Sequence, residues 1–183
     1  LVADGTYEEN INLNGKNLLV QSVNGSSATI IDGGRNGSVL TFKSKETKDS
    51  IFRGFTIQNG FRNQGAGIYI EGSSPMLDHL VIRDNHGGTN GGGICLNGYS
   101  YSVMNEITIE NNSSQYGGGI YCYNSSPTLE NVTITGNTSG YGGGIFCWED
   151  TNPSLENVTI TNNIAGGNLK LQSGQGKGDK SGG

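Results

Sequence analysis

Apolar and polar residues alternate in short runs along this chain, and through the C-terminal half the runs return about every 26 residues. Alternation over three or four residues predicts β-strands, because successive side chains of a strand point to opposite faces. Three sets of runs recur in a fixed order, each with its own inward-facing apolar positions. The first set holds Leu77, Met104, Leu129 and Leu155; the second holds Leu80/Ile82, Ile107/Ile109, Val132/Ile134 and Val158/Ile160; the third holds Ile68/Ile70, Ile94/Leu96, Ile120/Cys122 and Ile145/Cys147.

The residues between the runs repeat as well. Glycine triplets stand before the third set at residues 91–93, 117–119 and 142–144, with a weaker copy at 65–67. They predict tight corners that need a positive φ or a close approach of neighbouring coils. Asparagine recurs after the second set, at Asn85, Asn112, Asn137 and Asn163. These asparagines predict a stacked ladder of amides that bond the backbone at a bend and bond one another.

A fixed period of this length predicts a solenoid, in which equivalent residues of successive coils lie above one another at roughly 4.8 Å. The N-terminal half follows the same plan less regularly: Phe55/Ile57 extend the second set, while Leu40/Phe42 and Ile11/Leu13 extend the third. Crossovers between parallel strands are almost always right-handed. We therefore predict an all-β fold, a single right-handed parallel β-helix over residues 1–170 with about six coils and three short strands per coil. Residues 171–183 read as a flexible Gly/Lys-rich tail or linker.

Composition limits the classes of binding partner and the cellular location that we expect. The net charge of −5 argues against a nucleic-acid partner, which selects a basic face. No apolar run approaches the roughly 20 residues that span a bilayer, so no membrane span is expected. Richness in Asn, Ser, Thr and Gly fits secreted bacterial solenoids, which predicts an extracellular or cell-surface location. Residues 1–5 lack the features of a signal peptide and open inside what reads as a coil, so we expect a mature fragment or part of a longer protein.

The Gly-Gly-Gly-Ile and Ile-x-x-Asn pairs, together with residues 127–134 (PTLENVTI), resemble right-handed parallel β-helix proteins of the pectate-lyase-like superfamily. They also resemble the repeats of chlamydial polymorphic outer-membrane proteins. This resemblance implies the fold but not the activity, because the fold hosts lyases, hydrolases, adhesins and spacers. The lyase branch would imply an Asp-rich calcium cluster beside a basic residue, and the polygalacturonase branch Asp-Asp and Gly-His pairs; the sequence offers neither set.

We therefore expect a non-catalytic extracellular module with no required cofactor, serving as a structural, surface or carbohydrate-binding element. The uncapped first coil also predicts end-to-end self-assembly into a homo-oligomer or filament, because an open solenoid end exposes unpaired backbone. The alternative is a polysaccharide lyase or glycoside hydrolase fragment that acts on acidic polysaccharide. A minor alternative is an ice-binding solenoid, suggested by the pairs Thr133/Thr135 and Thr159/Thr161.

Aromatic residues concentrate at outward positions of the third set of strands. Such a face predicts a ligand platform or an interface, because exposed aromatic clusters are rarely left uncovered. Three occupants stay open: a glycan, another protein, or a segment of this chain. The candidate residues are Tyr69, Tyr121 and Phe146 in one row, Tyr123 and Trp148 two residues further along, and Tyr116 and Tyr141 before the glycine triplets.

Few polar side chains are candidates for a metal site or a reactive site. Glu130 and Glu156 share an outward row with Asp78, and they are the candidate ligands of a Ca²⁺ ion. Arg53, one coil before Asp78, is predicted to pair with it. His79 occupies a bend that Asn131 and Asn157 fill later, which predicts a structural role, and His86 has no partner assignable from the sequence. Among the thiols, Cys122 and Cys147 are predicted inside as free cysteines and Cys95 outside as an accessible one.

Overall fold

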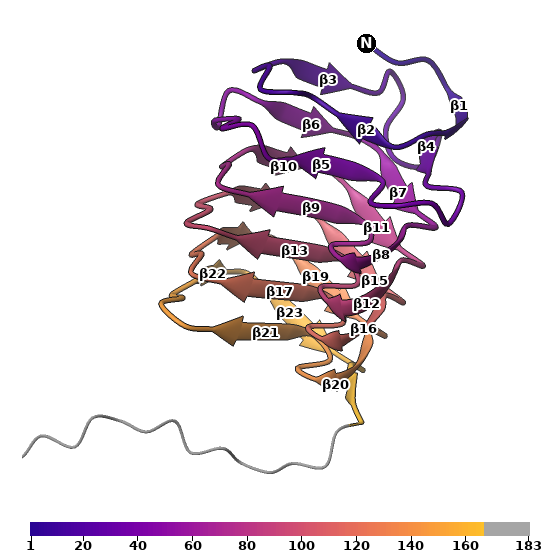
Figure 1. Ribbon diagram of the computed structural model, residues 1–183. Coiled ribbons are helices and arrows are strands. Elements are labelled where there is room, and N and C mark those ends of the chain that lie inside the picture. Colours follow the sequence, from indigo (N-terminus) through magenta and orange to yellow (C-terminus); the bar gives the residue numbers. More distant parts are fainter. Residues whose placement is uncertain (167–183) are drawn as a thin grey trace, which may run out of the picture.

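The computed structural model describes residues 1–166, which form a solenoid of β-strands without helices in this range (Figure 1). Every strand pairing between neighbouring coils is parallel, so each coil lies directly on the next. The strands build four sheets, of which three run the length of the molecule and the fourth begins at Phe61. We number these sheets in the order in which the chain visits them within one coil.

Sheet 1 contains β2 (Ile11–Asn12), β5 (Leu40–Phe42), β9 (Ile68–Glu71), β13 (Ile94–Asn97), β17 (Ile120–Tyr123) and β21 (Ile145–Trp148). Sheet 2 contains β3 (Leu19–Gln21), β6 (Ile51–Arg53), β10 (Met76–Asp78), β14 (Val103–Asn105), β18 (Thr128–Glu130) and β22 (Ser154–Glu156). Sheet 3 contains β1 (Gly5–Glu8), β4 (Thr29–Asp32), β7 (Thr56–Gln58), β11 (Val81–Arg83), β15 (Thr108–Glu110), β19 (Thr133–Thr135) and β23 (Thr159–Thr161). Sheet 4 contains β8 (Phe61–Gln64), β12 (His86–Asn90), β16 (Ser113–Tyr116), β20 (Thr138–Tyr141) and β24 (Ile164–Ala165).

The three predicted rows of inward apolar residues are confirmed as sheets 1, 2 and 3. Leu77 pairs with Met104 and Ile82 with Ile109 in neighbouring coils. From β8 onward, sheet 4 adds a fourth short strand to each coil, one more than the three that the pattern predicts. Most of its strands are built from polar residues and glycine, as in HGGTN of β12 and SSQY of β16, and so they carry no apolar alternation by which the sequence could reveal them.

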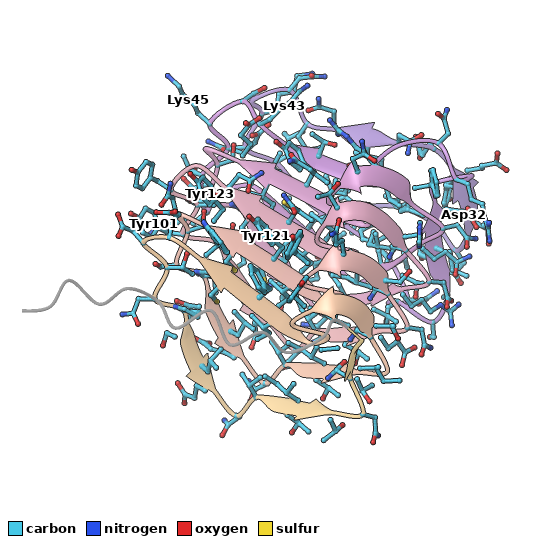
Figure 2. The ribbon with its side chains drawn as sticks, turned by 60° about the horizontal axis from the view of Figure 1, so that its bottom comes forward. Asp32, Lys43, Lys45, Tyr101, Tyr121 and Tyr123 are labelled. Carbon is cyan, nitrogen blue, oxygen red and sulfur yellow. The ribbon has the colours of Figure 1, made fainter. Side chains whose placement is uncertain are left out.

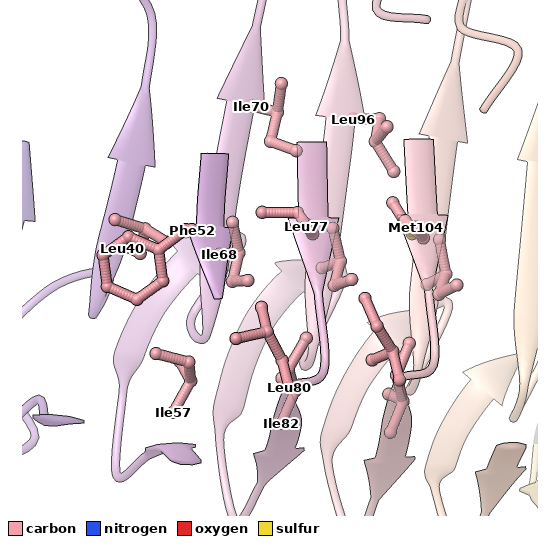
Figure 3. Packing of buried hydrophobic residues seen from close by; sticks show 14 of the residues in the cluster. Leu40, Phe52, Ile57, Ile68, Ile70, Leu77, Leu80, Ile82, Leu96 and Met104 are labelled. Atoms are coloured by element: carbon pink, nitrogen blue, oxygen red, sulfur yellow. The ribbon is translucent and has the colours of Figure 1, made fainter. Parts of the chain in front are cut away.

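The core is a column of stacked apolar side chains inside the coils. Figure 3 shows Leu40, Ile68, Leu77 and Met104 among them, each fully buried. Equivalent apolar residues stack from coil to coil, so the side chains of one coil cover those of the next. Burial of a Leu or Ile side chain contributes about 2 kcal/mol, and repetition along the column makes this the main stabilising term.

The glycine triplets form the corner between sheets 4 and 1. Gly117 has φ +65°, which disfavours a residue with a Cβ. Gly118 needs no special φ, but a Cβ there would lie 2.6 Å from the carbonyl oxygen of Gly143 in the next coil. Both predicted reasons for the glycines, a positive φ and a close approach between coils, are therefore confirmed.

The asparagine ladder is also confirmed, at the corner between sheets 3 and 4. The Oδ1 of Asn137 accepts hydrogen bonds from the backbone N–H of Asn112 at 2.9 Å and from its Nδ2 at 3.0 Å. The Nδ2 of Asn137 in turn donates to the carbonyl oxygen of Ile109 at 2.9 Å. The left-handed backbone lies one residue earlier than the ladder, for example at Asn111 with φ +55°. The asparagine side chains therefore form hydrogen bonds with buried backbone groups that the sharp bend leaves without a β-sheet partner.

The segment from Lys43 to Ser50 contains a charged side chain that turns inward. Glu46 is 1% exposed, and its carboxylate accepts hydrogen bonds from the N–H of Gly15, the N–H of Ser44 and the hydroxyl of Ser73. Burial alone would raise the pKa of Glu46, but these donors outweigh it and hold the pKa below the ordinary value. The carboxylate thus joins three coils.

The predicted tail, residues 171–183, lies outside the described residues, as does the end of the predicted domain at residue 170. Within residues 1–166, no helix is long and apolar enough to cross a membrane.

Candidate aromatic ligand site

The aromatic site arises from the alternation of inward and outward side chains along the strands of sheet 1. In β17, Ile120 and Cys122 point into the core, and so Tyr121 and Tyr123 point outward (Figure 2). The pairing of β17 with β21 then places Phe146 beside Tyr121 and Trp148 beside Tyr123. The sequence pattern and the register together bring side chains from separate coils onto one face.

Ring stacking connects these side chains. The rings of Tyr121 and Phe146 are nearly parallel, with centroids 5.8 Å apart and an angle of 6°. Phe146 also stacks on Trp148 at 5.9 Å. From sheet 4, Tyr116 and Tyr141 stack at 5.2 Å, and Tyr116 meets Phe146 at 5.4 Å. Phe146 is therefore the point where the aromatic rows of sheets 1 and 4 join, which defines one aromatic face.

Exposure divides the aromatic face into a covered and an open part. Tyr69 and Tyr121 are buried at 7% and 9% exposure, while Tyr123, Tyr141 and Trp148 are exposed at 37%, 40% and 47%. Rings on strands roughly 4.8 Å apart must lie on one another, so the inner members of a row bury their faces. Burial also raises the pKa of the Tyr69 and Tyr121 hydroxyls. The open part of the predicted site is its C-terminal end.

Tyr69, the remaining candidate, lies at the closed end of this face. The guanidinium carbon of Arg62 sits 4.9 Å from the centre of its ring, a cation–π contact. The adjacent Cys95 fills the space between Tyr69 and Tyr121. Tyr69 therefore supports the face from within, and a ligand cannot reach the flat side of its ring.

A family model supplies the external evidence on fold. The model described as "right handed beta helix region" matches residues 9–176, most of the chain. The chain belongs to the right-handed β-helix family. Comparison with curated proteins and with solved structures gave no match. Membership confirms the predicted fold and its hand, and it leaves activity and ligand open because this fold carries many unrelated functions.

The thiols of this β-helix differ from expectation in two places. Cys95 points outward as predicted, but Tyr69 and Tyr121 cover it completely, and burial raises its pKa to about 12. The predicted accessible thiol at Cys95 is therefore wrong. Cys147 is in register with the buried Cys122, as predicted, yet it is exposed, because no described strand pairs with β21 on its far side. The three cysteines are free, and a hydrogen bond from Cys122 lowers the pKa of Cys147 to about 7.

The predicted acidic row runs along sheet 2. Asp78, Asn105, Glu130 and Glu156 are register partners in successive coils. Glu130 is half-buried and Glu156 is exposed. Within residues 1–166 there is no group of three or more His, Cys, Asp or Glu side chains placed to hold a metal ion. The Ca²⁺ site at the two glutamates therefore stays a prediction.

Asp78 itself is buried at 1% exposure and forms the ion pair with Arg53 that the sequence predicts. It also accepts a hydrogen bond from the Nδ2 of Asn105 at 2.9 Å and lies 2.7 Å from the Nδ1 of His79. Burial would raise the pKa of Asp78, but Asn105, His79 and Arg53 together hold it below the ordinary value. His79 has φ +51°, like Asn131 at +55°, which confirms its structural role at the bend.

Proposed function

We propose that this β-helix is an extracellular surface module that binds polysaccharide at the open end of its aromatic face. The observation that carries the proposal is the convergence of Tyr123, Tyr141 and Trp148, which are exposed on three strands. Tyr141 and Trp148 are connected by ring contacts through Tyr116 and Phe146, and Tyr123 is the register partner of Trp148. Exposed aromatic residues that gather on one face of a rigid scaffold indicate a binding surface.

The chemistry of these side chains suits sugars. A pyranose ring combines an apolar C–H face with polar hydroxyls, and Tyr and Trp combine an apolar ring with a hydrogen-bonding tip. The Nε1 of Trp148 donates to Glu149 at 2.9 Å, which orients the indole and adds a carboxylate acceptor for sugar hydroxyls. A sugar ring would stack on the exposed faces of Trp148 and Tyr141.

Rigidity supports the same proposal. The binding side chains stand on strands β17, β20 and β21, which are hydrogen-bonded into the column of coils, so little order is lost when a ligand binds. Long polysaccharide chains can contact several of the aromatic residues at once. Modest affinity at each contact then adds along the chain through effective concentration.

The test is a glycan array of plant, algal and bacterial polysaccharides, followed by calorimetric titration with the best binders. Trp148→Ala is expected to raise the Kd at least about tenfold, since buried aromatic anchors contribute 1–2 kcal/mol or more at interfaces. Trp148→Phe should retain most of the affinity. Leu19→Ala, an exposed apolar residue on sheet 2 away from the aromatic face, is the matched control and should leave the Kd unchanged. Absence of binding to every polysaccharide would remove the proposal.

A further inference from the structure

A polar groove opens at the corner between sheets 3 and 4, near the N-terminal half of the solenoid and separate from the aromatic face. Its volume is about 430 Å³, within the range of small-molecule sites. The groove crosses successive coils, and residues of four turns or strand starts line it. Its lining includes Arg35, Phe61, Asp84, His86 and Ser113.

The groove contains a hydroxyl bonded to an imidazole. The Nδ1 of His86, the first residue of β12, lies 2.7 Å from the Oγ of Ser113, the first residue of β16. The two are register partners in neighbouring coils. His86 is exposed and Ser113 is partly exposed, so both reach the solvent of the groove. This pair supplies the partner that the sequence could not assign to His86.

Neighbouring serines show that the contact is specific. The hydroxyl of Ser114 donates to the carbonyl oxygen of Tyr116 at 2.9 Å, and that of Ser139 donates to Tyr141 at 2.8 Å. Those hydroxyls are held by backbone acceptors and cannot be activated by them. Ser113 instead faces a side chain that can take its proton, which is the arrangement that turns a serine hydroxyl into a nucleophile.

A stacked ring holds the imidazole in place. The ring of Phe61 stacks on that of His86, with centroids 5.4 Å apart and an angle of 15°. Asp84 lines the groove from the same turn as His86, and Arg35 lines it from a turn two coils away. A base fixed beside a hydroxyl in an open groove is the arrangement required for attack of that hydroxyl on an acyl carbonyl.

We propose that Ser113 and His86 are a nucleophile–base pair that hydrolyses small, solvent-exposed acyl esters. The Oγ of Ser113 attacks the ester carbonyl while the Nδ1 of His86 takes the hydroxyl proton. The C–O bond to the alcohol then breaks, and the alcohol leaves with that proton. Water, deprotonated by His86, attacks the acyl-serine, which releases the carboxylic acid and restores the hydroxyl. This activity departs from the non-catalytic module expected from the sequence, and it does not depend on polysaccharide binding.

The test uses an alkyl fluorophosphonate, which a nucleophilic serine attacks at phosphorus with loss of fluoride. The purified full chain is treated with the probe, digested, and mapped by peptide mass spectrometry. Ser113 is expected to carry the label, at a rate well above that of Ser114. His86→Gln can still hydrogen-bond the hydroxyl but cannot accept its proton, so the rate of labelling should fall about 100-fold or more.

Ser114→Ala is the matched control and should label at the wild-type rate at Ser113. Thermal unfolding of each variant, followed by circular dichroism, shows whether it remains folded. Label at Ser113 no greater than at Ser114, or equal labelling of wild type and a folded His86→Gln, would overturn the proposal. A second readout is burst release of p-nitrophenol from p-nitrophenyl acetate, which Ser113→Ala should abolish.

Discussion

At the scale of single residues, the polar side chains inside this β-helix work by satisfying backbone groups that the corners leave unpaired. Asn137 is fully buried, and its amide bonds coils on both sides of it. The repeat predicts this role, because the same residue returns at the same place in each coil. The contacts that the repeat could not predict join unlike residues, such as Glu46 with Ser73 or His86 with Ser113.

The asparagine ladder leads to a stability prediction. Asn137→Leu removes the acceptor of the buried N–H of Asn112 and of one of the two hydrogen bonds that the Nδ2 of Asn112 donates, and it removes the donor to the carbonyl of Ile109. The free energy of unfolding should fall by at least about 2 kcal/mol, since an unsatisfied buried group costs 1–3 kcal/mol. Urea unfolding measures the change. Asn152→Leu, an exposed position, should stay within about 0.5 kcal/mol of wild type. Equal stability of the two variants would contradict an inward, bonded ladder.

Asp78 gives a pH-dependent prediction. The pKa of Asp78 is lower in the folded chain than its ordinary value near 3.9. The charged carboxylate therefore contributes fully to the free energy of unfolding above that pH, and this contribution is lost as the pH falls through the folded pKa. Asp78→Asn should therefore destabilise the protein by about 2 kcal/mol at pH 7, where the charged hydrogen bonds are lost. The difference in free energy of unfolding between variant and wild type should become smaller below about pH 4. Urea titrations at pH 7 and pH 3 measure both differences; a difference independent of pH would show that the carboxylate charge is not the source.

At the scale of the elements, three of the four sheets follow from the alternation of apolar residues. Sheets 1 to 3 point an apolar side chain into the core at every second position, and that period is visible in the sequence. Sheet 4 escapes prediction because its strands pack against glycines of the adjacent corner rather than through apolar side chains. A Cβ on Gly92 would lie 2.5 Å from the carbonyl oxygen of Ser113, so the backbones themselves are in contact. Close contact between backbones, rather than burial of apolar side chains, therefore determines where the fourth strand lies.

This close contact predicts the effect of adding one methyl group. Gly118→Ala places a Cβ 2.6 Å from the carbonyl oxygen of Gly143, where only a shift of backbone can relieve the clash. The free energy of unfolding should fall by at least about 3 kcal/mol. Gly166→Ala, whose Cβ would lie 3.8 Å from the carbonyl oxygen of Ser139, an ordinary van der Waals distance, should be almost neutral. Thermal and urea unfolding compare the pair, and a neutral Gly118→Ala would mean that the coils lie further apart at this corner.

At the scale of the whole molecule, the column of coils places residues that are about 26 positions apart on one continuous surface. The aromatic face was predicted from that spacing, and its register is confirmed. Its exposure was not predictable from the sequence, because it depends on how tightly stacked rings cover one another. The covered Tyr69 and the open Trp148 occupy neighbouring rows of one sheet and differ in what lies over them.

The chain contains one tryptophan, and it stands at the open end of the aromatic face, so its fluorescence reports directly on ligand binding there. A polysaccharide identified on the array should change the intensity or wavelength of Trp148 emission in a saturable way. The midpoint should equal the Kd from calorimetry. A polysaccharide that binds with the same Kd while Trp148 emission stays constant would place the binding surface elsewhere and contradict the assignment of this face.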